Sequence, residues 1–348
     1  MSKPVSGLLR WAALAFIAGQ LAATSARAAA DAALYEAAKA EKEVVWYTTL
    51  ILDTAVRPII SAFQKKYPGV TVKFSRADSA PTALKVLNEA RAGKVQADVF
   101  DGTETAGPII RAGLAAKYIP TEANKYPAEL KDPNGFWNAY ILYFLTPAIN
   151  TDLTPQKDWP KTAEDLLDPK WKGKISWGMS SSTGGISFIA GIMLSMGDEK
   201  GLAYLKRLAQ QNIQNVDVTA RAMVDRVGAG DYPLTLGIFN HHTVMSAQKG
   251  APVTWLKLEP IVAPLALIGI TKDAPHPNAA RLFVEFITAE EGQKLFADLD
   301  FLPAMPSVLP KTPSLTPAGG NFKPIYLTQE IVAANQETWN RIMKELFQ

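Results

Sequence analysis

The chain has 348 residues, which is too long for one ordinary compact core and suits two lobes of moderate size. Hydrophobic residues make up 48% and charged residues 20%, a composition that excludes a disordered chain and a polytopic membrane protein. The absence of cysteine excludes disulfides, thiolate catalysis, thiolate metal sites and a lipid anchor attached through cysteine.

Residues 1–28 have the pattern of a cleaved signal peptide. A basic start is followed by an apolar run from Trp11 to Ala23 and by the small-residue site Ala26-Arg27-Ala28. The run is shorter than the about 20 residues that a membrane-spanning helix needs. Cleavage would remove three basic residues and no acid, leaving 33 of each sign, so a formally neutral protein has no electrostatic reason to bind nucleic acid. Export without an anchor predicts a periplasmic protein, with secretion into the medium as the alternative.

Helices and strands alternate along the rest of the chain. We predict helices over residues 33–42, 54–66, 82–92 and 108–115, with strands over 43–47, 70–74 and 97–100. After residue 150 we predict helices over 162–167, 186–196, 200–210 and 221–227, with strands over 174–177 and 233–239. This alternation predicts an α/β fold of two Rossmann-like lobes, in which ligands sit beyond the carboxyl ends of the parallel strands.

Two hydrophobic, extended segments connect the predicted lobes. Residues 140–149 and 262–270 each contain one proline, and we interpret them as the paired strands of a hinge. This assigns residues 31–140 plus 265–348 to lobe 1 and residues 141–264 to lobe 2. Residues 278–298 and 327–346 are predicted to be helices. The proline-rich residues 303–324 between them are predicted to lie on the surface, because proline excludes regular helix and central strand.

Candidate ligand residues in lobe 1 follow the first and third predicted strands: Tyr47, Thr48, Thr49, Asp101, Gly102 and Thr103. Backbone N–H groups at the start of the next helix carry a partial positive charge that suits an anion. A role as a helix cap is the alternative for Thr48, Thr49 and Asp101. The other aromatic residues near strand ends and the hinge are assigned to the core, with stacking on an organic ligand in the cleft as the alternative: Trp46, Trp137, Tyr140, Tyr143 and Trp177.

Lobe 2 has a hydroxyl-rich loop between a strand and an apolar helix. This loop contains the candidates Ser180, Ser181, Ser182, Thr183 and Gly184, whose hydroxyls and small residues allow close approach to a charged group. Further candidates come later in the lobe: Arg221, Asn240, His241 and His242. Arg221 is a candidate for a bidentate contact, with a solvent-facing side chain as the alternative.

Five segments in order carry a family resemblance: EVVWYTTL (43–50), QADVFDGTETAG (96–107), DPKWKGKISWGMSSSTGG (168–185), LGIFNHHTV (236–244) with HPNAARLFVEFITAEEGQKLFAD (276–298), and FLPAMPSV (301–308). The chain resembles the extracellular solute-binding proteins of ABC importers, particularly the branch of ferric-ion-binding proteins. The resemblance implies a type II periplasmic-binding-protein fold with a two-strand hinge. It also implies a monomer that holds a small-molecule or ion ligand and delivers it to the permease membrane subunits.

The resemblance to the ferric branch does not extend to that branch's ligands. It places a tyrosine pair at His241 and His242, a histidine near Ile51 and a glutamate near Thr103. Ferric iron prefers hard oxygen donors, and Ile51 supplies none, so these departures argue against iron. Hydroxyl-rich loops at helix N-termini favour an anion instead. A metal ion held by His241, His242 and Asp101 is the alternative, and no cofactor is predicted.

We predict a binding protein and not an enzyme. The sequence has no HExxH, no phosphate-binding G-x-x-x-x-G-K-[ST] and no G-x-S-x-G. A secreted hydrolase with a triad of Ser182, His241 and an aspartate is one alternative, since such residues converge only in space. A partner of a membrane receptor that senses the ligand is another.

Overall fold

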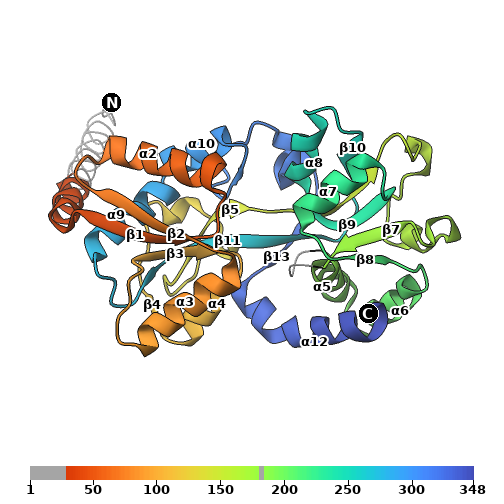
Figure 1. The fold of residues 1–348 in the computed structure, drawn as a ribbon, viewed down its shortest axis with the longest axis horizontal. Helices are drawn as coiled ribbons and strands as arrows, with labels where there is room; N and C mark the ends of the chain where they lie inside the picture. The colour runs from red at the N-terminus through yellow and green to blue at the C-terminus, as the bar shows by residue number, and fades with distance from the viewer. Residues whose placement is uncertain (1–28, 180–183) are drawn as a thin grey trace, which may run out of the picture.

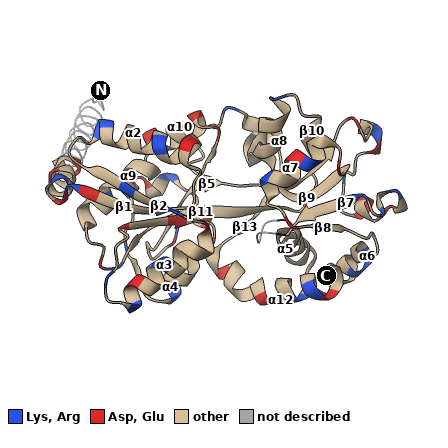
Figure 2. Ribbon diagram, in the orientation of Figure 1, with Lys and Arg blue, Asp and Glu red and all other residues tan. Residues whose placement is uncertain are grey.

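The computed structural model describes residues 29–179 and 184–348. The predicted signal peptide over residues 1–28 and the candidates Ser180, Ser181, Ser182 and Thr183 therefore lie outside the described residues. The chain forms two α/β lobes whose sheets are connected by shared strands (Figure 1). Residues of both charge signs are scattered over both lobes (Figure 2). None of the helices in the described part of the chain is long and apolar enough to cross a bilayer.

The sheet of lobe 1 has the order β2-β1-β3-β11, with β2 at its edge. Its strands are β1 (Glu43–Thr48), β2 (Thr71–Arg76), β3 (Val99–Gly102), β4 (Ala115–Ala116), β5 (Asn138–Leu142), β11 (Ile261–Thr271) and β12 (Leu302–Pro303). Strand β1 pairs in parallel with β2 and β3, whereas β11 pairs antiparallel to β3. Val44, Trp46 and Tyr47 of β1 are all buried, because helices cover both faces of this sheet.

The helices of lobe 1 form two layers. They are a helix over residues 29–41, α2 (Arg57–Lys66), α3 (Ser79–Arg91), α4 (Ala106–Arg111), α9 (Pro277–Thr288) and α10 (Glu290–Asp298). Helices α2, α9 and α10 pack into one hydrophobic cluster, and α3 and α4 pack into another. A π-helical turn, Leu52–Val56, leads into α2. The carboxyl ends of β1, β2 and β3 are directed toward lobe 2 (Figure 1).

Lobe 2 has a second sheet with the order β6-β9-β7-β8. Its strands are β6 (Leu145–Asn150), β7 (Ile175–Gly178), β8 (Gln214–Val216), β9 (Leu234–Phe239), β10 (Val253–Trp255) and β13 (Pro324–Leu327). Its helices are α5 (Gly185–Met196), α6 (Asp198–Ala209), α7 (Ala220–Ala229), α8 (Asn240–Ala247) and α12 (Gln329–Phe347). Short helical turns lie at Ala123–Lys125, Ala128–Leu130, Gln156–Asp158, Glu164–Leu167, Pro169–Trp171, Pro313–Leu315 and α11 (Pro317–Gly320).

Strand β11 connects the two sheets. It pairs antiparallel with β5 of lobe 1, where Leu265 opposes Leu142, and with β6 of lobe 2, where Val262 opposes Leu145. The predicted pair of crossing strands is therefore present. The chain crosses a third time after β12, because β13 pairs in parallel with the first residues of β11.

The last helix packs against lobe 2, whereas we predicted from the sequence that it belongs to lobe 1. Residues 265–348 were assigned to lobe 1, yet Trp339, Ile342 and Met343 of α12 are buried in the cluster that α5 and α6 build in lobe 2. Its amphipathic pattern predicts a helix, but such a pattern does not identify the surface that the apolar side covers.

Two further predictions need correction. The expected helix over 278–298 is two helices, because Ala289 is extended (ψ 158°) and the Thr288 hydroxyl bonds back to the Val284 carbonyl. The proline-rich residues 303–324 do not lie wholly on the surface, since Met305, Leu315 and others are buried near the hinge. Proline prevents regular structure in this segment without preventing burial.

Candidate ligand-binding site

A hollow of about 540 Å³ lies between the lobes. Lobe 1 lines it with residues 49–51, 78–81 and 103–104, which follow the carboxyl ends of β1, β2 and β3, and with Phe301. Lobe 2 lines it with residues 219–221, 239 and 241–242. Tyr143, which lies between β5 and β6, also lines it. This volume is in the range of pockets that hold small organic molecules. The hollow has the position predicted for a ligand in a two-lobed α/β protein.

The buried carboxylate of Asp101 shapes the lobe 1 side of the hollow. It accepts hydrogen bonds from Trp46 Nε1 (2.7 Å), Thr49 N (2.9 Å) and Thr49 Oγ1 (2.9 Å). Burial raises the pKa of the Asp101 carboxyl above its ordinary value, and its hydrogen bonds oppose that shift. Asp101 does not line the hollow, but it fixes the loop whose residues 49–51 do.

Of the other lobe 1 candidates, Thr49 and Thr103 line the hollow and three do not. Tyr47 is 3% exposed, and its hydroxyl donates to Glu89 Oε1 over 2.5 Å. Thr48 is fully buried, and its hydroxyl accepts from Leu50 N. At Gly102 (φ 136°) a Cβ would lie 2.3 Å from Thr105 Oγ1, so a glycine is needed there for packing.

On the lobe 2 side, Arg221 connects two helices. It lies in the first turn of α7, where Thr219 caps the helix by accepting from Ala222 N. One guanidinium nitrogen donates to the His242 carbonyl (2.9 Å), and the other donates to Asp225 Oδ1 (2.7 Å) and Ser246 Oγ (2.8 Å). Its side chain remains 35% exposed and lines the hollow. Arg221 is thus held in position beside the space that a ligand would occupy.

Two candidates of lobe 2 are placed away from the hollow. Asn240 is fully buried and donates from Nδ2 to the Leu315 carbonyl over 3.0 Å. Gly184 (φ 88°) packs against backbone, since a Cβ there would lie 2.4 Å from the Gly178 carbonyl oxygen. Both residues shape the lobe and are not in contact with the hollow.

Three helix N-termini border the hollow. Helix α3 begins after Asp78, α7 after Thr219 and α8 after Phe239, and all three flanking residues line the hollow. The first backbone N–H groups of a helix lack intrahelical partners and carry a partial positive charge. The N-termini of α7 and α8 therefore favour a negatively charged group, whereas the carboxylates of Asp78 and Glu104 oppose one on the lobe 1 side of the hollow.

His241 and His242 lie in the first turn of α8 and line the hollow with their rings 4.4 Å apart. Burial, followed by the charge of Arg221, lowers the pKa of His241 to about 4. Burial, His241 and Arg221 lower the pKa of His242 well below its ordinary value. Neither Nδ1 atom has a hydrogen-bond partner among the described residues. Both imidazoles are therefore neutral at pH 7 and have an unused polar atom.

The lowered pKa predicts that folding stability falls in acid. Between the ordinary value of 6.5 and about 4, the unfolded chain binds a proton at His241 that the folded chain does not. The free energy of unfolding therefore falls as the pH drops below 6.5. For this residue the loss is about 2 kcal/mol between pH 7 and pH 5. In urea denaturation, His241→Gln should lose correspondingly less stability over that interval than the parent protein. An equal loss in both proteins would contradict the burial of a neutral imidazole.

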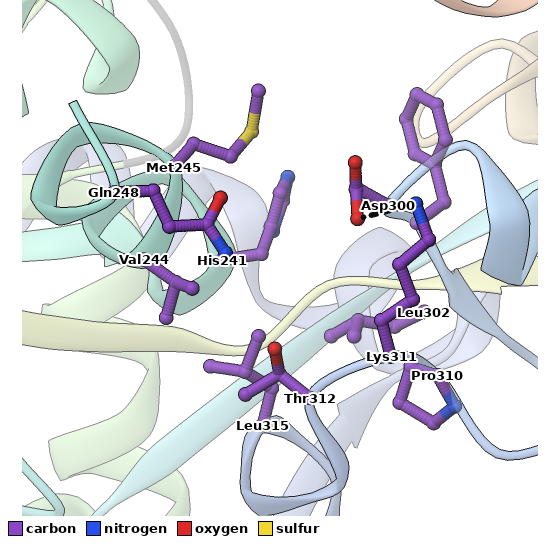
Figure 3. Close-up of a pocket in the computed structure, with 11 residues that line it drawn as sticks. His241, Val244, Met245, Gln248, Asp300, Leu302, Pro310, Lys311, Thr312 and Leu315 are labelled. Atoms are coloured by element: carbon purple, nitrogen blue, oxygen red, sulfur yellow. Dashed lines mark ion pairs between the residues drawn. The ribbon is translucent and has the colours of Figure 1, made fainter.

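His241 also borders a smaller pocket (Figure 3). Met245 of α8 and Gln248, the residue after that helix, lie on one side, and the ion pair between Asp300 Oδ1 and Lys311 Nζ (3.1 Å) lies on the other. Its volume of about 20 Å³ is room for a single water molecule. The larger hollow is consequently the candidate site for a solute.

The described residues contain no group of three or more histidine, aspartate or glutamate side chains that could hold a metal ion. The alternative of a metal bound by His241, His242 and Asp101 is not supported, because the Asp101 oxygens are engaged by Trp46 and Thr49.

Several lining residues were not among the sequence-based candidates. Residues 78–81 have a readable signal, since Asp78 and Pro81 flank the start of a helix after a strand. Thr219 has a similar capping signal. Tyr143, Phe239 and Phe301 give no local signal, because only the tertiary structure brings them to the hollow.

Comparison with known protein families accounts for this geometry. A family model described as bacterial extracellular solute-binding protein matches residues 96–323. The chain belongs to this family. Its members are transport substrate-binding proteins, which is consistent with a ligand site between two lobes.

Relatives of the chain include proteins that are named for iron. The chain is 27% identical over 274 residues to iron uptake protein A2 of Synechocystis sp., covering 70% of this chain and 75% of the relative. It is 25% identical over 273 residues to the Fe(3+)-binding periplasmic protein of Serratia marcescens, covering 75% and 78%.

Solved structures confirm the two-lobed type II fold. The periplasmic binding protein AfuA of Actinobacillus pleuropneumoniae, determined with fructose-6-phosphate, superposes with a TM-score of 0.72 at 23% identity, covering 87% of this chain and 98% of that one. Iron-bound HitA of Pseudomonas aeruginosa gives 0.71 at 25% identity, covering 86% and 99%. Binding proteins of this fold therefore hold ligands of different chemistry.

Proposed function

We propose that this protein is the periplasmic substrate-binding component of an ABC importer, which captures a small anionic solute between its lobes and delivers it as a monomer to the permease. The proposal rests on the convergence of three helix N-termini and Arg221 on one hollow. Partial positive charges at the helix N-termini and the guanidinium together attract an anion. Hydroxyls of Ser79 and Thr103 add donors from lobe 1.

Closure about the crossing strands is the proposed mechanism. A solute held by the N-termini of α7 and α8 gains contacts with the lobe 1 loops when the lobes approach. Because those contacts exist only in the closed form, the solute shifts the equilibrium between open and closed forms toward closed. The importer would then recognise the closed protein.

A second candidate solute is ferric iron or a divalent metal ion. The names of these relatives favour it. The lining residues of this chain do not, since the described part holds no group of three histidine, aspartate or glutamate side chains that could bind a metal ion. Metal ions therefore belong in the test as competitors of anions.

A thermal-shift screen tests the proposed function. The panel contains phosphate, sulfate, phosphonates, carboxylates, amines, ferric ion and divalent metal ions. At a hundredfold excess over Kd a solute adds about 2.7 kcal/mol, which raises Tm by roughly 5–10 °C for lobes of this size. We expect anions to produce this shift. A response to metal ions alone would support the second candidate, and consumption of the responding compound would indicate an enzyme.

Arg221→Ala should weaken anion binding about ten- to hundredfold, the range for loss of one charged hydrogen-bond donor. The measurement is titration calorimetry with the best anion of the screen. Arg226→Ala is the matched control, because Arg226 lies on the same helix and pairs with Asp231 outside the hollow.

Since Arg221 also connects α7 to α8, the Tm of the ligand-free variant shows whether the fold has changed. A folded Arg221→Ala protein that binds as tightly as the parent would overturn the role of Arg221.

A further inference from the structure

The hollow is larger and more apolar than a bare oxyanion needs. Phosphate and sulfate are a few ångströms across, whereas the hollow measures about 540 Å³. Besides its polar residues, it is lined by Leu50, Ile51, Ala80, Pro81, Tyr143, Ala220, Phe239 and Phe301. A second, apolar part of the ligand would displace the water that an oxyanion alone leaves against these side chains.

Lobe 1 exposes an aliphatic side chain at this site. Ile51 is 57% exposed and is held in the loop that Asp101 fixes through Thr49. A single exposed isoleucine on a protein surface needs no explanation. Ile51, however, lines the same hollow as three aromatic side chains, so a ligand body can cover apolar surface from both lobes.

Lobe 2 contributes an aromatic wall, which we define as Tyr143, Phe239, His241 and His242. The Tyr143 and Phe239 ring centroids are 4.7 Å apart, and the Tyr143 ring stacks on His241 at 5.8 Å with 24° between the planes. Phe239 meets His242 edge-on at 5.3 Å. These rings support one another before a ligand arrives, so binding needs little further ordering of side chains.

The wall carries no charge. Both imidazoles are neutral, and their unpartnered Nδ1 atoms are themselves buried. The anion-binding helix N-termini of α7 and α8 adjoin this wall, because Arg221 and the two histidines come from their first turns. A ligand with its anionic group at these termini has its remaining atoms against the wall.

We infer that the solute is an organic anion with an apolar or flat ring body, which is covered by Ile51 of lobe 1 and the aromatic wall of lobe 2. This inference rests on the proposed function and names the class of substrate for the same site. A carrier of bare oxyanions or metal ions would bind a ligand without such a body.

A graded set of probes tests the inference. Calorimetric titration with phosphate, methylphosphonate, butylphosphonate and phenylphosphonate keeps the anionic group similar while the body grows. We expect affinity to rise at least tenfold from phosphate and methylphosphonate to the tighter of the two larger probes. Acetate and benzoate form a second pair with the same expectation.

Two variants locate the contact. Ile51→Ala should reduce the ratio of the affinity for the larger probe to the affinity for methylphosphonate about three- to tenfold. Leu153→Ala is the matched control, because Leu153 is similarly exposed at 52% and does not line the hollow. It should change neither affinity.

The outcomes separate the two proposals. If no anion binds, the proposed function fails and this inference fails with it. If phosphate binds as tightly as the larger probes, or Ile51→Ala leaves their advantage intact in a folded protein, anion binding stands and the organic body is excluded.

Discussion

Replacing Asp101 with alanine is expected to destabilise the protein by about 3–5 kcal/mol, the cost of removing one partner from a buried charged network. The substitution leaves the Trp46 indole N–H and the Thr49 backbone N–H without the acceptor that both now share. Each buried donor without a partner costs about 1–3 kcal/mol. Urea denaturation of the ligand-free protein measures the loss.

The same substitution should weaken ligand binding, because Asp101 holds the loop that contains Ile51. Asp53→Ala is the matched control: Asp53 is exposed and pairs with Arg57 on the surface, where an ion pair contributes less than about 1 kcal/mol. A loss no larger than that of the control would show that Asp101 is not the residue that fixes the loop.

Replacing Trp339 with alanine is expected to cost about 3–5 kcal/mol, as is usual when a large buried aromatic side chain is removed. Trp339 is 2% exposed and packs in the core of lobe 2, although it comes from the last helix of the chain. Thermal or urea unfolding followed by tryptophan fluorescence measures the change.

Glu337→Ala on the exposed side of α12 is the control for Trp339 and should change stability by less than about 0.5 kcal/mol. If the two variants are equally stable, α12 does not contribute to the core of lobe 2. Calorimetry that resolves two transitions would show the Trp339 variant lowering the transition of lobe 2 in particular.

The order of elements could be predicted from the sequence because it depends on local patterns. Alternating strands and helices predicted both lobes, and the proline-containing apolar segments predicted the crossing strands. The three-residue strands β8 and β10 were missed, because they are too short to show a period. Helix α8 was missed because it begins at the residue that follows β9.

Candidate residues that reach the hollow could be predicted where they follow a strand or lie in the first turn of a helix. Thr49, Thr103, Arg221, His241 and His242 meet at one hollow. The position after a strand does not reveal which way a side chain points, and for this reason Tyr47 and Asn240 were included although both are buried elsewhere. Contributions from the hinge region depend on how the lobes pack, which no short stretch of sequence encodes.

The late position of β11 and α12 in the chain has a consequence for biosynthesis. A nascent polypeptide that ends before residue 261 contains β1, β2 and β3 but lacks the strand that pairs with β3 and joins the lobes. Such a polypeptide also lacks the final helix, which covers a hydrophobic side of lobe 2. Neither half has all of its elements until translation is nearly complete.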